Sequence, residues 1–233
     1  MRVAIERPEV SLPLKLAAEF LGTALLVAVV VGSGHMVDAI TNDTGVALLL
    51  NQFATILALG VLVALLMPIS GAQINPAVTL AMMIRRRMNI GEGLAYILVQ
   101  LPGAVLGTIA AQAMFDLPLI ELSSRDRITP GTFLGEMVAT VGLIALILTA
   151  LYQGKNSWLP LLVPAWIGAG YFFTSSTSFA NPAVTIGRTF TESFSGISWA
   201  SAPWFIAAQA AGVVIALALV APFERAYIQG EKQ

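Results

Sequence analysis

The sequence predicts an all-α membrane protein with six transmembrane helices and two re-entrant half-helices, arranged as an inverted repeat. Three observations predict this fold class: a composition poor in charge, uncharged runs of awkward length, and a ten-residue motif that occurs twice. Hydrophobic residues make up 57% of the 233 residues and charged residues 11%, whereas soluble domains carry about 25% charged residues. So few charges cannot cover a water-facing surface, and we expect most of the chain to lie in lipid.

The composition also excludes several classes of function. A net charge of −1 gives no basis for nucleic-acid binding. Without cysteine the chain has no disulfide, thiolate nucleophile or cysteine metal site, and His35 is its only histidine. We therefore expect no bound metal, no cofactor and no catalytic residues, because an intramembrane enzyme would need a nucleophile and a base that this chain does not supply.

Six segments are long and apolar enough to cross about 30 Å of hydrocarbon as helices. They are residues 14–34, 46–67, 93–115, 132–152, 158–177 and 200–222. The charged residues Arg2, Glu6, Arg7 and Glu9 precede the first segment, and no cleavage site follows it. We interpret this segment as the first span and not as a removed signal peptide.

The basic residues predict the orientation, because cytoplasmic loops carry an excess of lysine and arginine. With both termini inside, as six spans require, the outer side receives only Arg125, Arg127 and Arg188. The cytoplasmic side then receives Arg2, Arg7, Lys15, Arg85, Arg86, Arg87, Lys155, Arg225 and Lys232. We expect a multi-pass protein of the cell (inner) membrane, with the Arg85–Arg87 run as a positive-inside anchor rather than a nucleic-acid site.

Two uncharged runs, Thr44 to Ile84 and Asn156 to Gly187, are too long for one crossing and too short for two with a normal turn. The surplus of each run holds the sequence Asn-Pro-Ala-Val-Thr. We expect one full span followed by a loop that dips into the membrane and returns as a short half-helix. Irregular backbone at membrane depth is tolerated only where it lines a cavity or is buried in protein, so the loops indicate a pore or a binding site.

The chain repeats itself. The segment Ser70–Thr79 recurs as Ser176–Thr185, and in each half a glutamate precedes it and a Gln-x-x-Gly sequence follows it. Each half holds three spans, so the second half must enter the membrane inverted. We predict a single transmembrane channel domain over residues 1–233, with a first repeat at about 12–115 and a second at about 130–222.

Each Asn-Pro-Ala sequence is suited to start a helix. Proline is tolerated at the first helical position, and asparagine is a favoured N-cap. The motif residues are Asn75, Pro76, Ala77, Asn181, Pro182 and Ala183. Two helix starts facing one passage, each carrying about +0.5 elementary charge, repel cations and protons. The asparagine amides can donate hydrogen bonds to a passing neutral oxygen.

Glu19 and Glu136 are intramembrane carboxylates, which are functional candidates by default. They could carry protons in a coupled transporter, or they could accept hydrogen bonds from the backbone of the re-entrant loops. Their matching positions in the two halves favour loop support, and the same interpretation holds for Gln100 and Gln209. We expect His35 to be a solvated loop residue at the outer end of the first span.

The two NPA boxes, the first-span sequence Ala18–Thr23 and the glutamate near the start of the fourth span resemble the aquaporin (major intrinsic protein) family along almost the whole chain. The resemblance implies a right-handed six-helix bundle with two half-helices, assembled as a homotetramer with one pore per subunit. It also implies passive conduction of water or small uncharged solutes across the lipid bilayer.

The resemblance further implies a selectivity filter of four residues. The residue after the second NPA, usually arginine, is Val184, and the other loop position is Ser178. Counting without gaps places Thr55 in the second span and Ala169 in the fifth, where a shift of one residue would substitute Gly170. All four side chains are small and uncharged, so we expect a wide filter that admits glycerol-like solutes larger than water.

Arg188 lies one turn after Val184, on the same helix face. We hypothesise that it lies in the outer vestibule and partly replaces the missing charge; the alternative is a snorkelling arginine paired with Glu192. A bacterial subgroup of the family, with some members linked to arsenic resistance, is similar in carrying valine at position 184, which adds neutral metalloid acids as candidate solutes. A water-selective aquaporin remains the alternative, and a secondary transporter is a further one.

Overall fold

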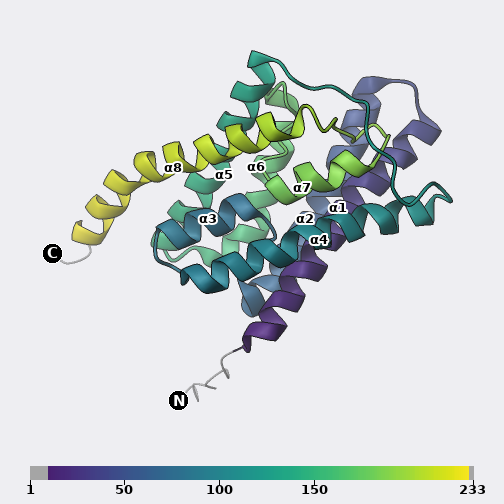
Figure 1. Cartoon of the computed structure of the whole chain (residues 1–233). Coiled ribbons are helices and arrows are strands. Elements are labelled where there is room, and N and C mark those ends of the chain that lie inside the picture. Colours follow the sequence, from purple (N-terminus) through teal and green to yellow (C-terminus); the bar gives the residue numbers. More distant parts are fainter. Residues whose placement is uncertain (1–9, 231–233) are drawn as a thin grey trace.

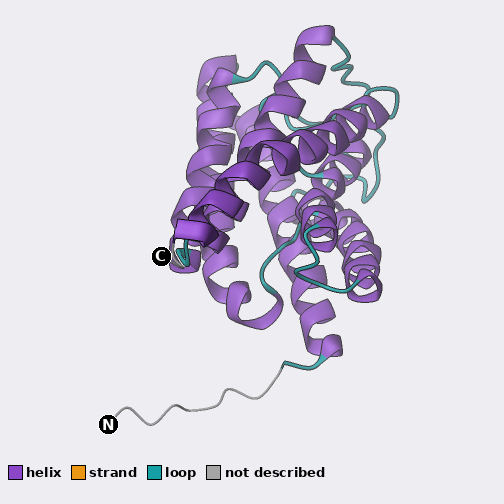
Figure 2. Ribbon diagram, turned by 90° about the vertical axis from the view of Figure 1, so that its left-hand side faces the viewer, coloured by secondary structure: helices purple, strands orange, loops and turns teal. Residues whose placement is uncertain are grey.

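The computed structural model describes residues 10–230, which form helices and loops without a strand in that range (Figures 1 and 2). Five of the described helices are long and apolar enough to cross a membrane. These are α1 (Leu12–Ile40), α2 (Thr44–Ser70), α4 (Ile90–Met114), α5 (Pro130–Tyr152) and α8 (Ala202–Gly230). The shorter elements are α3 (Pro76–Ile84), η1 (Asn156–Trp158), α6 (Leu159–Phe173), α7 (Pro182–Gly187) and η2 (Arg188–Phe190).

The predicted fold class is confirmed, and the bounds of several predicted spans need correction. The first and last spans continue beyond their predicted ends at 34 and 222, to Ile40 in α1 and Gly230 in α8. The fifth segment, expected over 158–177, is helical only to Phe173 in α6, which follows directly on η1. The chain leaves the helix at Thr174 because the next residues form the irregular approach to α7. The charged residues Arg2, Glu6, Arg7, Glu9 and Lys232 lie outside the described residues.

The two halves pack by equivalent helix pairs, α1 against α4 and α5 against α8, and glycines make both contacts close (Figure 1). A Cβ atom added to Gly107 of α4 would lie 2.2 Å from the carbonyl oxygen of Ala24 in α1. One added to Gly212 of α8 would lie 2.9 Å from the carbonyl oxygen of Met137 in α5. Only glycine permits this approach of two backbones, as is common between helices in lipid.

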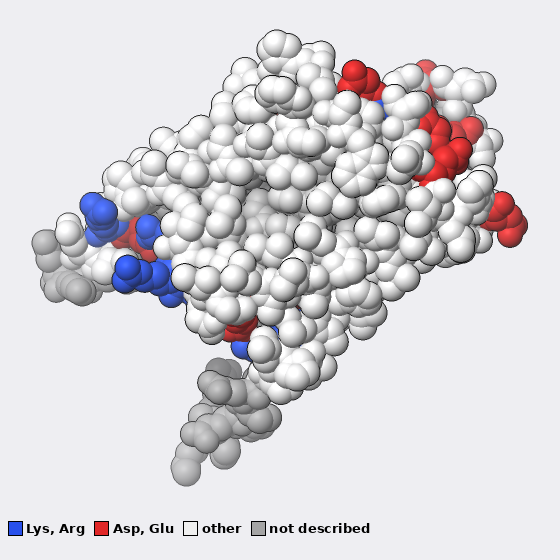
Figure 3. All heavy atoms as spheres, in the orientation of Figure 1, with Lys and Arg blue, Asp and Glu red and all other residues white. Residues whose placement is uncertain are grey.

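Charged side chains gather at the two ends of the molecule and leave an uncharged band between them (Figure 3). We call the end where α1 begins and α8 ends the termini side, and the opposite end the far side. Lysine and arginine predominate on the termini side and aspartate and glutamate on the far side, as Figure 3 shows. An uncharged band between two charged ends is the distribution that a bilayer requires.

Candidate pore

The two half-helices α3 and α7 begin at the NPA motifs and meet inside the molecule. Asn75 caps α3 by accepting from the amide of Ala77 at 2.9 Å, and Asn181 caps α7 by accepting from Ala183 at 3.0 Å. Each asparagine also donates through Nδ2 to the opposite half. Asn75 donates to the carbonyl of Ala180 at 2.8 Å and Asn181 to that of Ile74 at 2.9 Å. One hydrogen of each amide therefore joins the halves, and the second has no acceptor among the described residues.

The backbone before each asparagine adopts the same unusual conformation. Ala72 and Ile74 have φ of 49° and 38°, and the equivalent Ser178 and Ala180 have 52° and 46°. A non-glycine residue in the left-handed region costs of order 1–3 kcal/mol and persists only where its surroundings enforce it. Both segments must therefore be held by groups outside the pore.

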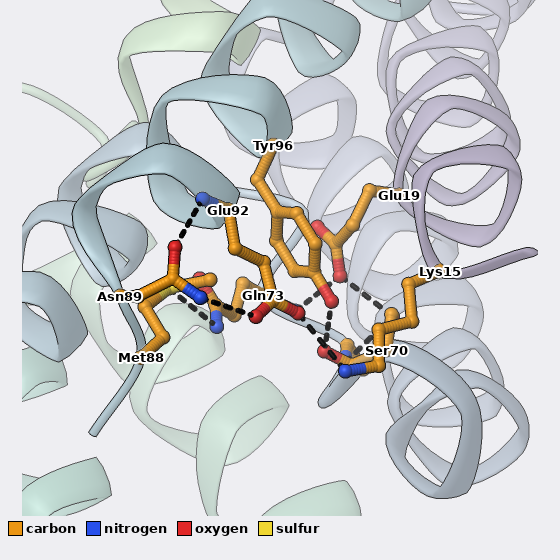
Figure 4. Close-up of polar contacts among 9 residues, drawn as sticks. Lys15, Glu19, Ser70, Gln73, Met88, Asn89, Glu92 and Tyr96 are labelled. Carbon is orange, nitrogen blue, oxygen red and sulfur yellow. Dashed lines mark hydrogen bonds and ion pairs between the residues drawn. The ribbon is translucent and has the colours of Figure 1, made fainter. Parts of the chain in front are cut away.

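Glu19 of α1 binds the first of these segments from the side that faces away from the cavity (Figure 4). Its carboxylate accepts from the amides of Gln73 and Ile74 at 2.9 and 2.6 Å and from the hydroxyl of Ser70 at 2.7 Å. The amide of Gln100 adds a fourth bond at 2.8 Å and also donates to Thr79 of α3.

Glu136 serves the second segment in the same way. It accepts from the amides of Phe179 and Ala180 at 2.7 and 2.9 Å and from Gln209 at 2.7 Å. Gln209 also donates to Thr185 of α7 at 3.0 Å. Both carboxylates are fully buried, and neither lines the cavity described next. These contacts fit loop support.

One cavity of about 580 Å³ extends along the half-helix junction from the termini side to the far side. Asn75 and Asn181 line it near the middle, Arg87 and Asn156 at the termini side, and Arg188 at the far side. Most of the remaining wall is apolar, including Leu26, Val30, Leu59, Val63, Val78, Leu143, Ile147 and Val163. A passage with apolar walls and a few donors and acceptors suits a small polar molecule.

Three of the four expected filter residues, Thr55, Ser178 and Val184, line the far end of this cavity. Ala169 does not: its side chain is exposed on α6. Gly170 is the residue of α6 that meets the second loop, since a Cβ there would lie 2.4 Å from the hydroxyl oxygen of Ser178. The gap-free count was wrong by one residue, which on a helix turns a side chain by about 100°.

Tyr171 is a cavity residue that the count missed. It follows Ile167 by one helical turn, and both line the cavity. The Tyr171 hydroxyl donates to Oγ1 of Thr55 at 3.3 Å, because the Thr55 hydroxyl is itself the donor to the carbonyl of Asn51. The available sequence signal was the spacing of four between Ile167 and Tyr171, which are separated only by the small residues 168–170.

Arg188 is buried, with 3% of its surface exposed, and lines the cavity rather than an open vestibule. Its Nε donates to the carbonyl of Ser195, and its guanidinium carbon lies 3.4 Å from the ring centroid of Phe179. This distance permits a cation–π interaction. The suggested pairing with Glu192 is absent, because that carboxylate accepts from the amide and hydroxyl of Ser124.

Arg127, from the loop before α5, fixes the same far-side segment. Its guanidinium donates to the carbonyls of Gly196 and Phe194 at 2.8 and 3.1 Å, on either side of the carbonyl that Arg188 uses. Burial, with a smaller contribution from Arg125, lowers the pKa of Arg127 to about 10. It therefore remains protonated at neutral pH and keeps a fixed positive charge beside the carbonyls of Phe194 and Gly196.

The expectation for His35 was wrong. It belongs to α1, has 7% of its surface exposed, and its Nε2 lies 3.1 Å from Oγ1 of Thr191. The ring also lies against Phe115, with centroids 5.5 Å apart. Helix α1 continues to Ile40, beyond the predicted end at 34, which places His35 inside the bundle.

Comparison with known proteins agrees with this geometry. The family model described as major intrinsic protein matches residues 8–179. The chain belongs to the major intrinsic protein family. It is 47% identical over 212 residues to the aquaglyceroporin AqpS of Rhizobium meliloti (strain 1021), covering 91% of each chain. It is 31% identical to a probable TIP-type aquaporin of Medicago truncatula, covering 73% of this chain and 72% of that one.

A solved structure shows the same fold. The X-ray structure of the aquaglyceroporin from Plasmodium falciparum aligns with a TM-score of 0.65 at 20% identity, covering 88% of this chain and 94% of that one. Major intrinsic proteins are channels. This member of the family is accordingly a membrane channel for water and small solutes, and not an enzyme.

Proposed function

We propose that this channel passes small uncharged polar solutes larger than water, together with water, through a far-side filter that carries no arginine at position 184. The observation that carries the proposal is the far end of the 580 Å³ cavity, where Thr55, Ser178 and Val184 stand together. Valine at that position contributes neither a charge nor a long side chain. On the side of the second loop, only the small side chains of Ser178 and Val184 therefore border the opening.

The cavity offers hydrogen bonds that replace those of a solute's hydration shell. The free hydrogens of Asn75 and Asn181 are donors at the middle. At the far end, Ser178 lines the cavity and is 2% exposed, and its hydroxyl is buried against Gly170 without a partner among the described residues. The apolar wall suits the carbon backbone of a polyol.

Positive charge bars cations without an arginine at position 184. Two half-helix starts face the middle of the cavity, each with about half a positive charge. Arg188 adds a full charge at the far end, one turn beyond Val184. A cation would meet both barriers in a narrow passage, whereas a neutral solute meets neither.

The proposed solutes are glycerol-like polyols and neutral metalloid acids, and the similarity to a relative named as an aquaglyceroporin supports the first class. One observation favours a water-selective channel instead. The phenol of Tyr171 reaches Thr55 from α6, where a small residue was expected, and narrows the passage on that side.

For the assembly we propose a homotetramer in the inner membrane, with one pore per subunit and both termini cytoplasmic. The excess of basic residues on the termini side supports that orientation. A secondary transporter is less well supported, because both intramembrane carboxylates are occupied by the backbone of the loops.

Stopped-flow light scattering on proteoliposomes tests the solute class. Vesicles with the wild-type chain should shrink and then reswell with glycerol, urea and a neutral metalloid acid. A Val184→Arg variant should slow reswelling by about 10-fold, an added barrier of about 1.4 kcal/mol, with much less effect on water. Val184→Leu, which adds size without charge, serves as the control.

Two results would overturn the proposal. Rapid shrinkage of wild-type vesicles without solute reswelling would identify a water-selective channel narrowed at Tyr171. Accumulation of a solute against its gradient would identify a transporter, because a channel only equilibrates.

A further inference from the structure

The cavity has one charged side chain at each end, and both are arginines. Arg188 lies at the far end and Arg87 at the termini-side mouth, beside Asn156. No carboxylate lines the cavity over the residues that the structure describes. The far-side arginine already has a proposed role in the barrier to cations, whereas Arg87 has been assigned no role beyond a membrane anchor.

The turn after α3 directs two arginines of the Arg85–Arg87 run toward α8. The amide of Arg86 donates to the carbonyl of Met83 and that of Arg87 to the carbonyl of Met82, both at 2.9 Å, which ends the helix. Arg86 takes the left-handed conformation, with φ of 55°. Because the chain turns at Arg86, the exposed Arg86 side chain is separated from those of Arg85 and Arg87, which both pair with one carboxylate.

That partner is Glu224, near the end of α8. One carboxylate oxygen lies 3.4 Å from Nη2 of Arg87, and the other is paired with Nη2 of Arg85. The side chain of Glu224 is 12% exposed, whereas that of Arg87 is 36% exposed. The anion is thus buried and fixed by the helix, and the cation at the mouth can reorient when it is released.

One carboxylate between two guanidinium groups leaves a net charge of +1 at this mouth. Without Glu224 the two arginines would repel each other at short range, with no counter-charge. Arg85 is the more buried of the two, at 26% side-chain exposure. Arg87 is therefore the more exposed partner, and the open space next to it is the cavity that it already lines.

We propose that Arg87 is a charge-selecting residue at the termini-side mouth and that Glu224 is its positioning residue. Held by Glu224, Arg87 repels entering cations from the wall of the mouth and leaves the passage open to neutral solutes. When the ion pair with Glu224 is broken, the Arg87 side chain moves over the mouth and obstructs the neutral solutes. The inference rests on the proposed function only for its neutral-solute part.

The magnitude follows from Coulomb's law. A unit charge about 7 Å from a passing monovalent cation in high-dielectric solvent changes the cation's energy by about RT, a factor of about 3 in flux. Arg86 provides a matched control, because it has the same charge in the same turn but neither lines the cavity nor pairs with Glu224.

The experiment compares wild-type chain, Arg86→Gln, Arg87→Gln, Glu224→Gln and the double variant Glu224→Gln/Arg87→Gln in proteoliposomes. Potassium leak under a fixed gradient is measured with a potassium-sensitive dye, and glycerol flux by reswelling. Arg87→Gln should raise the leak about 3-fold, while Arg86→Gln leaves it unchanged. Glu224→Gln should reduce glycerol flux, and adding Arg87→Gln to it should restore that flux.

Equal leaks in Arg87→Gln and Arg86→Gln would overturn the charge-selecting role. A loss of glycerol flux in Glu224→Gln that Arg87→Gln does not restore would show that Glu224 only anchors α8, and would overturn the positioning role. If the wild-type chain passes no glycerol, the proposed function fails, but the leak measurements still decide whether Arg87 selects charge.

Discussion

Replacing Glu136 by glutamine tests the idea that a buried carboxylate holds the second re-entrant loop in place. The carboxylate accepts three hydrogen bonds, from the amides of Phe179 and Ala180 and from the side chain of Gln209. Glutamine has one acceptor oxygen where glutamate has two, and its amide nitrogen would face at least one N–H donor. One bond is lost outright, a buried donor is left unpaired, and the surviving bonds lose their charge.

The expected loss follows from these contacts. Hydrogen bonds to a charged group contribute about 1.5–3 kcal/mol and neutral ones about 1 kcal/mol, so Glu136→Gln should cost about 3–5 kcal/mol. For a chain of this size 1 kcal/mol corresponds to about 2–4 °C in Tm, which predicts a fall of about 6–20 °C. Released from the carboxylate, Ser178 and Ala180 should leave their left-handed conformations, and solute flux should fall with stability.

Thermal unfolding in detergent, followed by tryptophan fluorescence, measures this loss. Glu192→Gln is the control, because it removes an equivalent charge from an exposed carboxylate on the same side. A Tm for Glu136→Gln within about 2 °C of wild type, which corresponds to less than 1 kcal/mol, would refute the loop-support reasoning. Full solute flux with a lowered Tm would show instead that the loop keeps its shape without the carboxylate.

Two further perturbations probe helix packing and the far-side charge. Gly107→Ala places a methyl group 2.2 Å from the carbonyl oxygen of Ala24, and this overpacking should cost about 1–3 kcal/mol in thermal unfolding. Gly32→Ala, whose added atom finds nothing nearer than 3.7 Å, should be nearly neutral, and equal effects of the two would contradict the packing argument. Arg188→Ala removes the charge at the far end and should raise proton leak and change the ratio of glycerol to urea flux, both measured in proteoliposomes. Unchanged proton leak and an unchanged flux ratio would show that Arg188 contributes neither to the charge barrier nor to solute selectivity.

The sequence predicts features carried by local rules and repeated in both halves. The helix starts at Asn75 and Asn181 follow from capping chemistry, and the roles of Glu19 and Glu136 follow from their matching positions relative to those starts. In the structure both asparagines cap their helices, and both carboxylates bind the loop backbone. Capping depends on residues a few positions apart, so an error in counting positions along a distant helix does not affect its prediction.

Features that depend on tertiary contacts were not accessible in this way. An error of one residue along α6 replaced Gly170 by Ala169 and concealed Tyr171, because each step on a helix changes the direction of the side chain. The ion pairs of Arg85 and Arg87 join the two halves of the chain, since Arg87 and Glu224 are 137 residues apart, and no local pattern connects either arginine with Glu224.

The two asparagine hydrogen bonds between the halves also imply an order in which the pore forms during synthesis. Asn75 donates to the carbonyl of Ala180, which lies 105 residues later in the chain. At a synthesis rate of about 5–20 residues per second, the first half-helix waits roughly 5–20 s for that acceptor to be made. Asn181 in turn finds the carbonyl of Ile74 already in place. Until Ala180 is made, the Asn75 amide lacks this acceptor, and the passage acquires its final shape only when the second loop has been made.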